Sequence, residues 1–205
     1  IYRFITNATN ERTFIATVIP PSIINLHSIY TIRPFEINPS KDDLAESPLW
    51  PAYEPAFTDE EMMAATGLLN SIPFDFIMRT KVNKEIYQYT FKETQVPRLT
   101  AGDEWFEYIW TRAARLNCYG EDFADLRERL GGVEPVTNVD ERQELQAEID
   151  AAAFHAYGLN TAETEFVLDD FYKVNSPRLM TDEYFESVFE KFEGLAETAP
   201  AAEQS

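Results

Sequence analysis

Histidine and cysteine, the side chains that most often bind transition metals or act as nucleophiles, are rare in this sequence. The 205 residues include two histidines, His27 and His155, and one cysteine, Cys118. His155 has no second ligand at a metal-binding spacing, which is typical of a partly buried histidine bonded to a neighbour. Cys118 has no histidine near it and is expected to be an inert, buried thiol. The sequence therefore predicts neither a metal site nor a cysteine nucleophile.

Carboxylates and glycines are present, but not in a catalytic or nucleotide-binding pattern. Asp169 and Asp170 fit the solvated face of a helix. Gly131 and Gly132 match neither a Walker sequence nor a G-x-G-x-x-G strand-to-helix turn, and they predict the end of a helix. We expect no catalytic residue and no bound cofactor in this chain.

Basic residues gather in one segment of an otherwise acidic chain. Five of the 17 lysines and arginines fall within residues 79–98, interleaved with asparagine, glutamine and tyrosine. Lysine and arginine bind phosphates, while asparagine and glutamine can read base edges. Residues near the N-terminus are expected to extend the same surface. The predicted DNA-binding residues are Arg12, Arg33, Arg79, Lys81, Asn83, Lys84, Gln88 and Lys92. An ordinary polar strand face is the alternative interpretation.

The net charge limits how nucleic acid could bind. The chain carries 36 acidic and 17 basic residues, a formal charge of -19, yet residues 1–100 hold 9 basic and 12 acidic side chains. Residues 101–205 hold 8 basic and 24 acidic ones, so this half would repel a polyanion. Any DNA contact must be local and belong to the first half. The second half is expected to face away from DNA.

Composition places the chain among folded proteins. Hydrophobic residues make up 44% of it, enough for a sizeable core, and no apolar run approaches the roughly 20 residues of a membrane span. We expect a cytoplasmic protein with no membrane partner. Because the chain opens in an apolar alternation without an initiating methionine, it is expected to be a domain excised from a longer polypeptide.

Strands are expected early in the chain. Residues 2–4 and 14–18 alternate apolar side chains around the turn-like NATN at residues 7–10, which predicts a hairpin. A third short strand is expected at residues 28–32. The long, proline-containing stretch at residues 34–57 predicts a loop that is functional or packed over the core.

A helical pair and a further strand should complete the first half. Thr58 and Glu61 have the spacing of a capping box and predict the start of a helix. Pro73 fits the first turn of the next helix. Residues 85–91, rich in tyrosine, threonine, isoleucine and phenylalanine, predict a strand that carries the basic segment.

The second half is predicted to be helical. Helices are expected between Thr100 and Gly120, between Asn138 and Gly158, and over residues 121–130, 161–171 and 181–195. The predicted fold is therefore α+β: a small β-sheet with helices in a domain of residues 1–100, then a C-terminal helical subdomain of residues 101–195 and a disordered tail at residues 196–205.

Several stretches together resemble a known family. ERTFIATVIPP at residues 11–21 resembles the E-R-T-x-I-A-x-x-I-P segment in the C-terminal target-recognition region of Eco57I-like (type IIG and type ISP-like) restriction-modification DNA methyltransferases and their phage-defence relatives. The family's helix and strand-to-proline segments, found more distantly in type I specificity subunits, are similar to LNS, FDF and QVP, at residues 69–71, 74–76 and 95–97. The terminal helical pattern of these regions is similar to ELQAEIDA, HAYGL and VLDDF, at residues 144–151, 155–159 and 167–171.

The resemblance implies a target-recognition module that binds double-stranded DNA. It implies a parent enzyme that is an S-adenosylmethionine-dependent N6-adenine methyltransferase, in some members with restriction activity. The N-P-P-Y tetrad and the S-adenosylmethionine motif of that family do not occur in this chain. Catalysis and the cofactor are thus expected in a catalytic methyltransferase domain of the same polypeptide, which is the second expected partner.

Two other classes of function compete with this interpretation. The acidic helices could dock on a partner subunit, or mimic DNA charge, in a protein-interaction domain that reads no DNA. A free-standing enzyme is the third and least favoured class, because the sequence offers no nucleophile, metal or cofactor constellation. Salt-dependent binding to duplex DNA separates the first two classes.

Overall fold

Helices dominate the structure, and its strands are short. The computed structural model describes residues 1–21, 23–37, 39–45, 53–171 and 173–198. Its strands are β1 (Tyr2–Arg3), β2 (Ile29–Tyr30), β3 (Phe35–Ile37) and β4 (Tyr53–Pro55). Its α-helices are α1 (Asp59–Leu69), α2 (Ile72–Lys81), α3 (Gln88–Lys92), α4 (Phe106–Asn117), α5 (Ala124–Arg129), α6 (Val139–Ala156), α7 (Thr161–Asp170) and α8 (Asp182–Thr198). The predicted α+β class is confirmed.

The strands form two small antiparallel sheets. β1 pairs with β2, with Tyr2 opposite Tyr30, and β3 pairs with β4, with Phe35 opposite Pro55. The predicted hairpin of residues 2–4 with 14–18 is reduced to one isolated bridge between Tyr2 and Ala16, and residues 14–18 form no strand. The third predicted strand corresponds to β2. The expected loop at residues 34–57 contains β3 and β4, and its residues 46–52 lie outside the described part of the chain.

Capping residues set the helix boundaries as expected. The Thr58 hydroxyl accepts from the Glu61 N–H, and the Glu61 carboxylate accepts from the Thr58 N–H, which closes the capping box at the start of α1. Asn138 caps α6 through the N–H of Glu141. Gly158, just after α6, has a φ of 71°, a left-handed conformation that glycine adopts without strain.

The prediction of a strand at residues 85–91 is wrong. Only Glu85 pairs as a strand would, opposite Ile5, and the chain then turns into the short helix α3. Helical geometry brings the Phe91 ring against Tyr2 and Phe14, at centroid distances of 5.1 Å and 5.8 Å. This aromatic packing outweighs the β propensity of the segment.

The core runs across the boundary predicted at residue 100. One cluster of buried side chains joins Met63 and Leu68 of α1 to Ile109 of α4 and Ile149 of α6. The absence of a side chain at Gly67 permits this contact, because a Cβ there would lie 2.7 Å from Ile109 Cγ2. The predicted first domain and helical subdomain thus share apolar packing.

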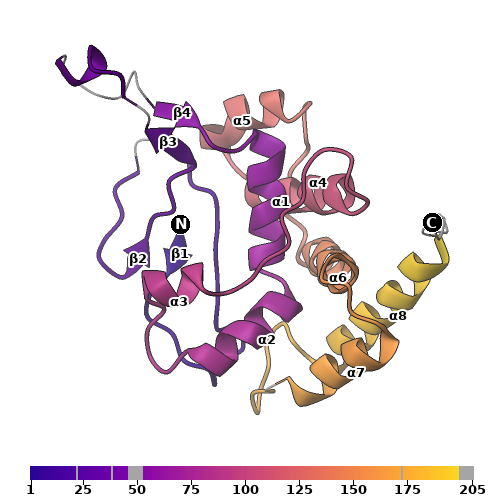
Figure 1. The fold of residues 1–205 in the computed structure, drawn as a ribbon. Coiled ribbons are helices and arrows are strands. Elements are labelled where there is room, and N and C mark those ends of the chain that lie inside the picture. The colour runs from indigo at the N-terminus through magenta and orange to yellow at the C-terminus, as the bar shows by residue number, and fades with distance from the viewer. Residues whose placement is uncertain (22, 38, 46–52, 172, 199–205) are drawn as a thin grey trace, which may run out of the picture.

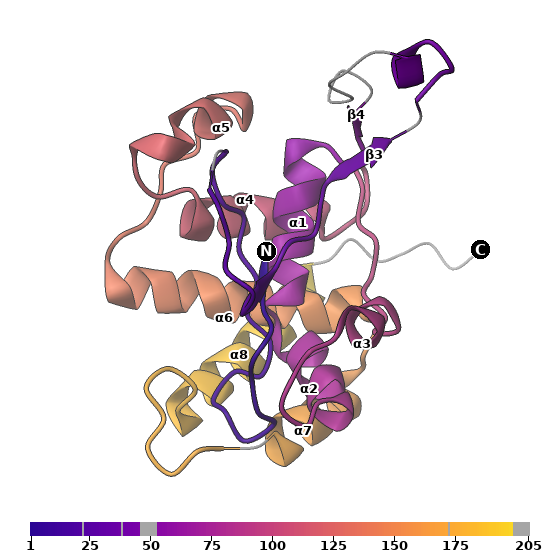
Figure 2. The ribbon, with the colours of Figure 1, turned by 90° about the vertical axis from the view of Figure 1, so that its left-hand side faces the viewer.

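The helices α1, α4 and α6 are stacked beside one another, while α2 and α3 lie on the side that faces β1 and β2 (Figure 1). In the perpendicular view, α8 packs against α6 at an oblique angle and lies away from α3 (Figure 2). Because α8 continues to Thr198, residues 196–198 of the predicted tail are helical, and residues 199–205 lie outside the described residues. None of the described helices is both long and apolar enough to cross a membrane.

Candidate nucleic-acid interface

Arg12, one of the predicted DNA contacts, points into the protein. Its guanidinium group lies 2.9 Å from a carboxylate oxygen of Asp150 on α6 and donates to the Asn70 carbonyl at 3.1 Å. Asp150, fully buried, also accepts from the Ile72 N–H at 2.8 Å and from the Tyr184 hydroxyl at 2.6 Å. The structure therefore places Arg12 in an internal ion pair, with its side chain only 16% exposed.

Burial and the charges within this cluster shift the pKa values of Asp150, Arg12 and Tyr184. Burial raises the pKa of the Asp150 carboxyl, and Arg12 opposes that rise. Burial alone would lower the pKa of Arg12, but the charge of Asp150 more than offsets it and raises that pKa. Burial and Asp150 together raise the pKa of Tyr184 well above its ordinary value. Tyr184 is therefore a protonated donor and Arg12 a fixed cation at neutral pH.

Arg79, another predicted DNA contact, also forms a buried ion pair. It forms a 2.9 Å ion pair with Asp75, one turn earlier on α2, and its side chain is only 8% exposed. The guanidinium group also donates to the carbonyls of Ala8, Asn10 and Glu11 at 2.7–2.8 Å. Arg79 thus fastens the 7–11 turn to α2. The structure leaves neither Arg12 nor Arg79 in the predicted DNA-contacting set.

The stretches that carry the family resemblance meet in this interior network. Glu11 accepts from three consecutive N–H groups, those of residues 178–180, at 2.6–2.8 Å. The N–H groups of Thr13 and Phe14 donate to Asp75 at 3.2 Å and 2.6 Å. With the pair of Arg12 and Asp150, these contacts tie the segments around residues 11, 75 and 150 into one unit. Their physical task in this chain is to close the fold.

Glu11 makes one part of the fold sensitive to acid. Partial burial favours its neutral form, but the three N–H donors outweigh this and hold the pKa of the carboxyl below its ordinary value of 4.5. Its stabilising contribution is therefore present above about pH 4.5 and is lost as the pH falls through the lowered folded-state pKa. We expect hydrogen exchange to show a selective loss of protection at the amides of residues 178–180 in that range. In Glu11→Gln this loss should be absent, because protection is already weak at neutral pH.

The other predicted residues of the basic segment lie on the surface where α2 connects to α3. Asn83, Lys84, Gln88 and Lys92 are exposed. Lys81 is exposed too, but its ammonium group donates to the Glu93 carbonyl at 2.9 Å and to the Thr94 hydroxyl at 3.2 Å. Among the described residues, no ion pair involves Lys84 or Lys92. These two ammonium groups are available to an external anion.

Two tyrosines stand between these lysines. The rings of Tyr87 and Tyr89 stack at a centroid distance of 5.4 Å with an 8° angle between planes. They are 42% and 62% exposed. The hydroxyl of Tyr87 donates to Glu85, a hydrogen bond that raises the pKa of Tyr87. The pair presents a flat aromatic surface, and Lys84 and Lys92 lie three residues before and after it in the sequence.

Arg33 lies beyond β2, on a neighbouring part of the surface. Phe4 contacts both Tyr30 of β2 and Tyr87, at centroid distances of 4.6 Å and 5.5 Å. β2 therefore lies beside the start of α3, as Figure 1 also shows. Arg33, exposed, follows Tyr30 by three residues. We call the surface of Lys81, Asn83, Lys84, Tyr87, Gln88, Tyr89 and Lys92 the α2–α3 surface.

The histidine and cysteine singled out from the sequence are structural. The His155 ring stacks on Trp105 and on Phe192, at 4.8 Å and 4.1 Å, and its Nε2 lies 2.9 Å from the Phe192 carbonyl oxygen. Cys118 is buried, and burial raises the pKa of its thiol to about 11. The predicted burial of Cys118 and the predicted bonding of His155 to a neighbour are confirmed. The residues that the structure describes contain no group of three or more His, Cys, Asp or Glu side chains placed to hold a metal ion.

Comparisons with known proteins add no assignment. No protein-family model matches the chain, and no match is found among curated proteins or solved structures. The relationship to Eco57I-like methyltransferases therefore stays an expectation from the resemblance.

Proposed function

We propose that this chain binds duplex DNA through the α2–α3 surface, as a target-recognition module of an N6-adenine DNA methyltransferase. The observation that carries the proposal is the availability of Lys84 and Lys92, exposed and without an ion-pair partner among the described residues of a chain with a net charge of -19. Lysines of this kind bind phosphate, and the exposed amides of the nearby Asn83 and Gln88 can read base edges.

The placement of acidic charge supports a local contact. Of the 36 acidic residues, 24 lie in residues 101–205. α8, one of the acidic helices, lies on the opposite side of the molecule from α3 in both views (Figures 1 and 2). DNA could therefore approach α3 without meeting that helix. Screening at physiological ionic strength, with a Debye length of about 8 Å, weakens the repulsion from more distant carboxylates.

In this proposal, methyl transfer takes place in another domain. A catalytic domain of the same polypeptide would bind S-adenosylmethionine and transfer the methyl group, while this chain positions the duplex. The resemblance supports the assignment, and three of its stretches contact one another through Arg12, Asp75 and Asp150. Asp75 lies on α2, the helix that leads into the α2–α3 surface.

The salt dependence of DNA binding tests the proposal. In the full-length protein, the double substitution Lys84→Gln with Lys92→Gln should weaken binding to a random-sequence duplex. It should also reduce the slope of log K against log salt by up to about 1.8, since each phosphate contact contributes about 0.9. Fluorescence anisotropy over a series of salt concentrations measures both quantities.

A second double variant controls for the loss of positive charge. Lys173 and Lys191 pair with Asp182 and Glu144, and Lys191 lies on α8. Lys173→Gln with Lys191→Gln should leave the slope unchanged. Equal slopes for both double variants would place the DNA surface elsewhere. Absence of any salt-dependent binding in the unsubstituted protein would favour the acidic protein-interaction domain.

A further inference from the structure

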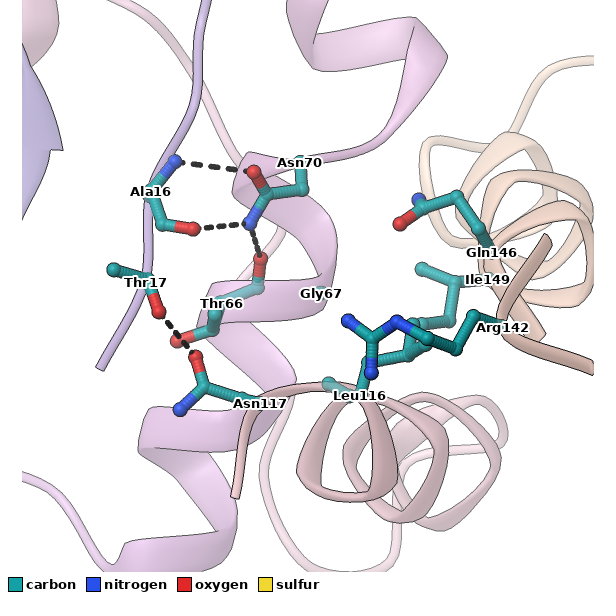
Figure 3. A pocket seen from close by; sticks show the side chains of 11 residues that line it. Ala16, Thr17, Thr66, Gly67, Asn70, Leu116, Asn117, Arg142, Gln146 and Ile149 are labelled. Carbon is teal, nitrogen blue, oxygen red and sulfur yellow. Dashed lines mark hydrogen bonds between the residues drawn. The ribbon is translucent and has the colours of Figure 1, made fainter. Parts of the chain in front are cut away.

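A pocket lies where the N-terminal segment meets three helices, apart from the α2–α3 surface. Its volume is about 230 Å³, and Figure 3 shows it open between residues 16–17 on one side and α6 on the other. α1 and α4 provide the remaining walls. The volume is smaller than that of most sites for drug-sized ligands, so the pocket suits a molecule with few non-hydrogen atoms.

Two asparagines fix the wall formed by the N-terminal segment. The Asn70 amide accepts from the Ala16 N–H at 3.0 Å and donates to the Ala16 carbonyl at 2.8 Å, as a neighbouring strand would (Figure 3). Asn117 accepts from the Val18 N–H at 3.0 Å and from the Thr17 hydroxyl at 2.7 Å. The wall is therefore held before any ligand arrives, which lowers the entropic cost of binding.

Two polar side chains of α6 point into the pocket, and each has N–H groups without an acceptor among the described residues. Arg142 and Gln146 lie one helical turn apart (Figure 3). Gln146 Nε2 is buried and has no hydrogen-bond partner among the described residues. Arg142 donates from Nη1 to the Val136 carbonyl at 2.7 Å and forms no ion pair among the described residues. Both groups can donate to the same acceptor.

Arg142 has no ion-pair partner among the described residues, although α6 carries several glutamates. The neighbouring glutamates of α6 are engaged with other arginines: Glu141 pairs with Arg115, and Glu148 with Arg112. A guanidinium group binds a carboxylate through two parallel hydrogen bonds, and a buried amide N–H needs an acceptor. Arg142 and Gln146 together are complementary to one carboxylate.

The rest of the pocket is only partly apolar, since Thr17, Thr66, Asn70 and Asn117 also line it. Its apolar lining consists of Gly67, Ala113, Leu116 and Ile149. A ligand that places a carboxylate against Arg142 can therefore pack a small hydrocarbon or aromatic body on this surface. We infer that the pocket binds a small monocarboxylate with an apolar body.

The charge of the site favours a carboxylate over a phosphate. One guanidinium group balances one negative charge, whereas a phosphate monoester carries about -1.5 to -2 at neutral pH. No lysine lines the pocket. The protein's net charge of -19 would further disfavour a dianion.

Ligand titration of the unsubstituted chain tests the inference without any mutation. The probes are phenylacetate, its neutral analogue phenylacetamide, and phenyl phosphate, with binding followed by the NMR signals of the Gln146 side-chain amide. We expect phenylacetate to bind in the millimolar range and to shift these signals. Phenylacetamide and phenyl phosphate should each bind about tenfold more weakly, because they lack a matched charge for Arg142.

A fourth probe separates the two sources of such a carboxylate. N-acetylphenylalanine carries its carboxylate after a peptide bond, as the C-terminus of a protein does. Preferential binding of this probe would assign the pocket to a peptide terminus, and preferential binding of phenylacetate to a free small acid. Either result supports a carboxylate site.

Substitutions locate the site. Arg142→Gln and Gln146→Met should each weaken phenylacetate binding, the former about tenfold, while Arg115→Gln, which removes an arginine outside the pocket, should not. Thermal unfolding of each variant verifies that it is folded. Equal affinity for phenylacetate and phenylacetamide, unchanged binding by folded Arg142→Gln, or no shift of the Gln146 amide at about 20 mM phenylacetate would each overturn the inference.

Discussion

Replacing Asp150 by asparagine is expected to lower the free energy of unfolding by about 3–5 kcal/mol, because removing one partner of a buried ion pair leaves the other charge uncompensated. Arg12, whose side chain is only 16% exposed, would keep its charge with no carboxylate beside it. The Tyr184 hydroxyl and the Ile72 N–H would also lose a charged acceptor. Urea denaturation at neutral pH measures the loss.

An exposed carboxylate on the same helix provides the matched control. Glu141 pairs with Arg115 at 2.8 Å, but the two side chains are 52% and 37% exposed. Glu141→Gln should therefore change the stability by less than about 1 kcal/mol. Combining Asp150→Asn with Arg12→Met should recover part of the loss, since the uncompensated charge is then gone. Equal effects of Asp150→Asn and Glu141→Gln would contradict the internal pair.

Truncation of Ile149 to alanine is expected to cost about 2–5 kcal/mol, the range for a large aliphatic side chain removed from a packed core. Ile149 is 1% exposed and belongs to the cluster shared by α1, α4 and α6. The midpoint of urea unfolding should fall while its slope, which reports the surface exposed on unfolding, stays the same.

Val139 offers the comparison within α6. It is the first residue of that helix and is 67% exposed. Val139→Ala should leave the stability within about 0.5 kcal/mol of the unsubstituted chain. Under the proposed function, DNA target preference should survive Ile149→Ala at temperatures where the variant is folded. A cost below about 1 kcal/mol would mean that α6 does not pack on α1 as described.

The helices could be predicted because their signals are local. The hydrogen bonds between Thr58 and Glu61, and between Asn138 and Glu141, link residues three apart, so the sequence pattern contains the whole interaction. The error at residues 85–91 has the opposite origin. The Phe91 ring gains its partners, Tyr2 and Phe14, from the other end of the first half, and no local propensity contains that contact.

The candidate interface was predictable only in part for the same reason. The charge of Lys84 and Lys92 is enough to predict that they are exposed. The same rule fails for Arg12, because the carboxylate that pairs with it lies 138 residues away in the sequence. One sequence feature could have revealed that partner. Asp150 interrupts the apolar run from Ile149 to Phe154, and an acidic residue in such a run needs a buried cation.

The contacts of Glu11 have a consequence for how this chain is made. Its three donors belong to residues 178–180, and the carboxylate that pairs with Arg12 belongs to Asp150, so Glu11 and Arg12 meet these partners only after those residues have been synthesised. At ribosomal rates of about 5–20 residues per second, this interval is on the order of ten seconds or more. Phe14 meets its aromatic partners Phe74 and Phe91 much earlier, but Arg12 lacks its carboxylate during that time. The two ionic contacts that close the fold at residues 11 and 12 are thus a late step of folding on the ribosome.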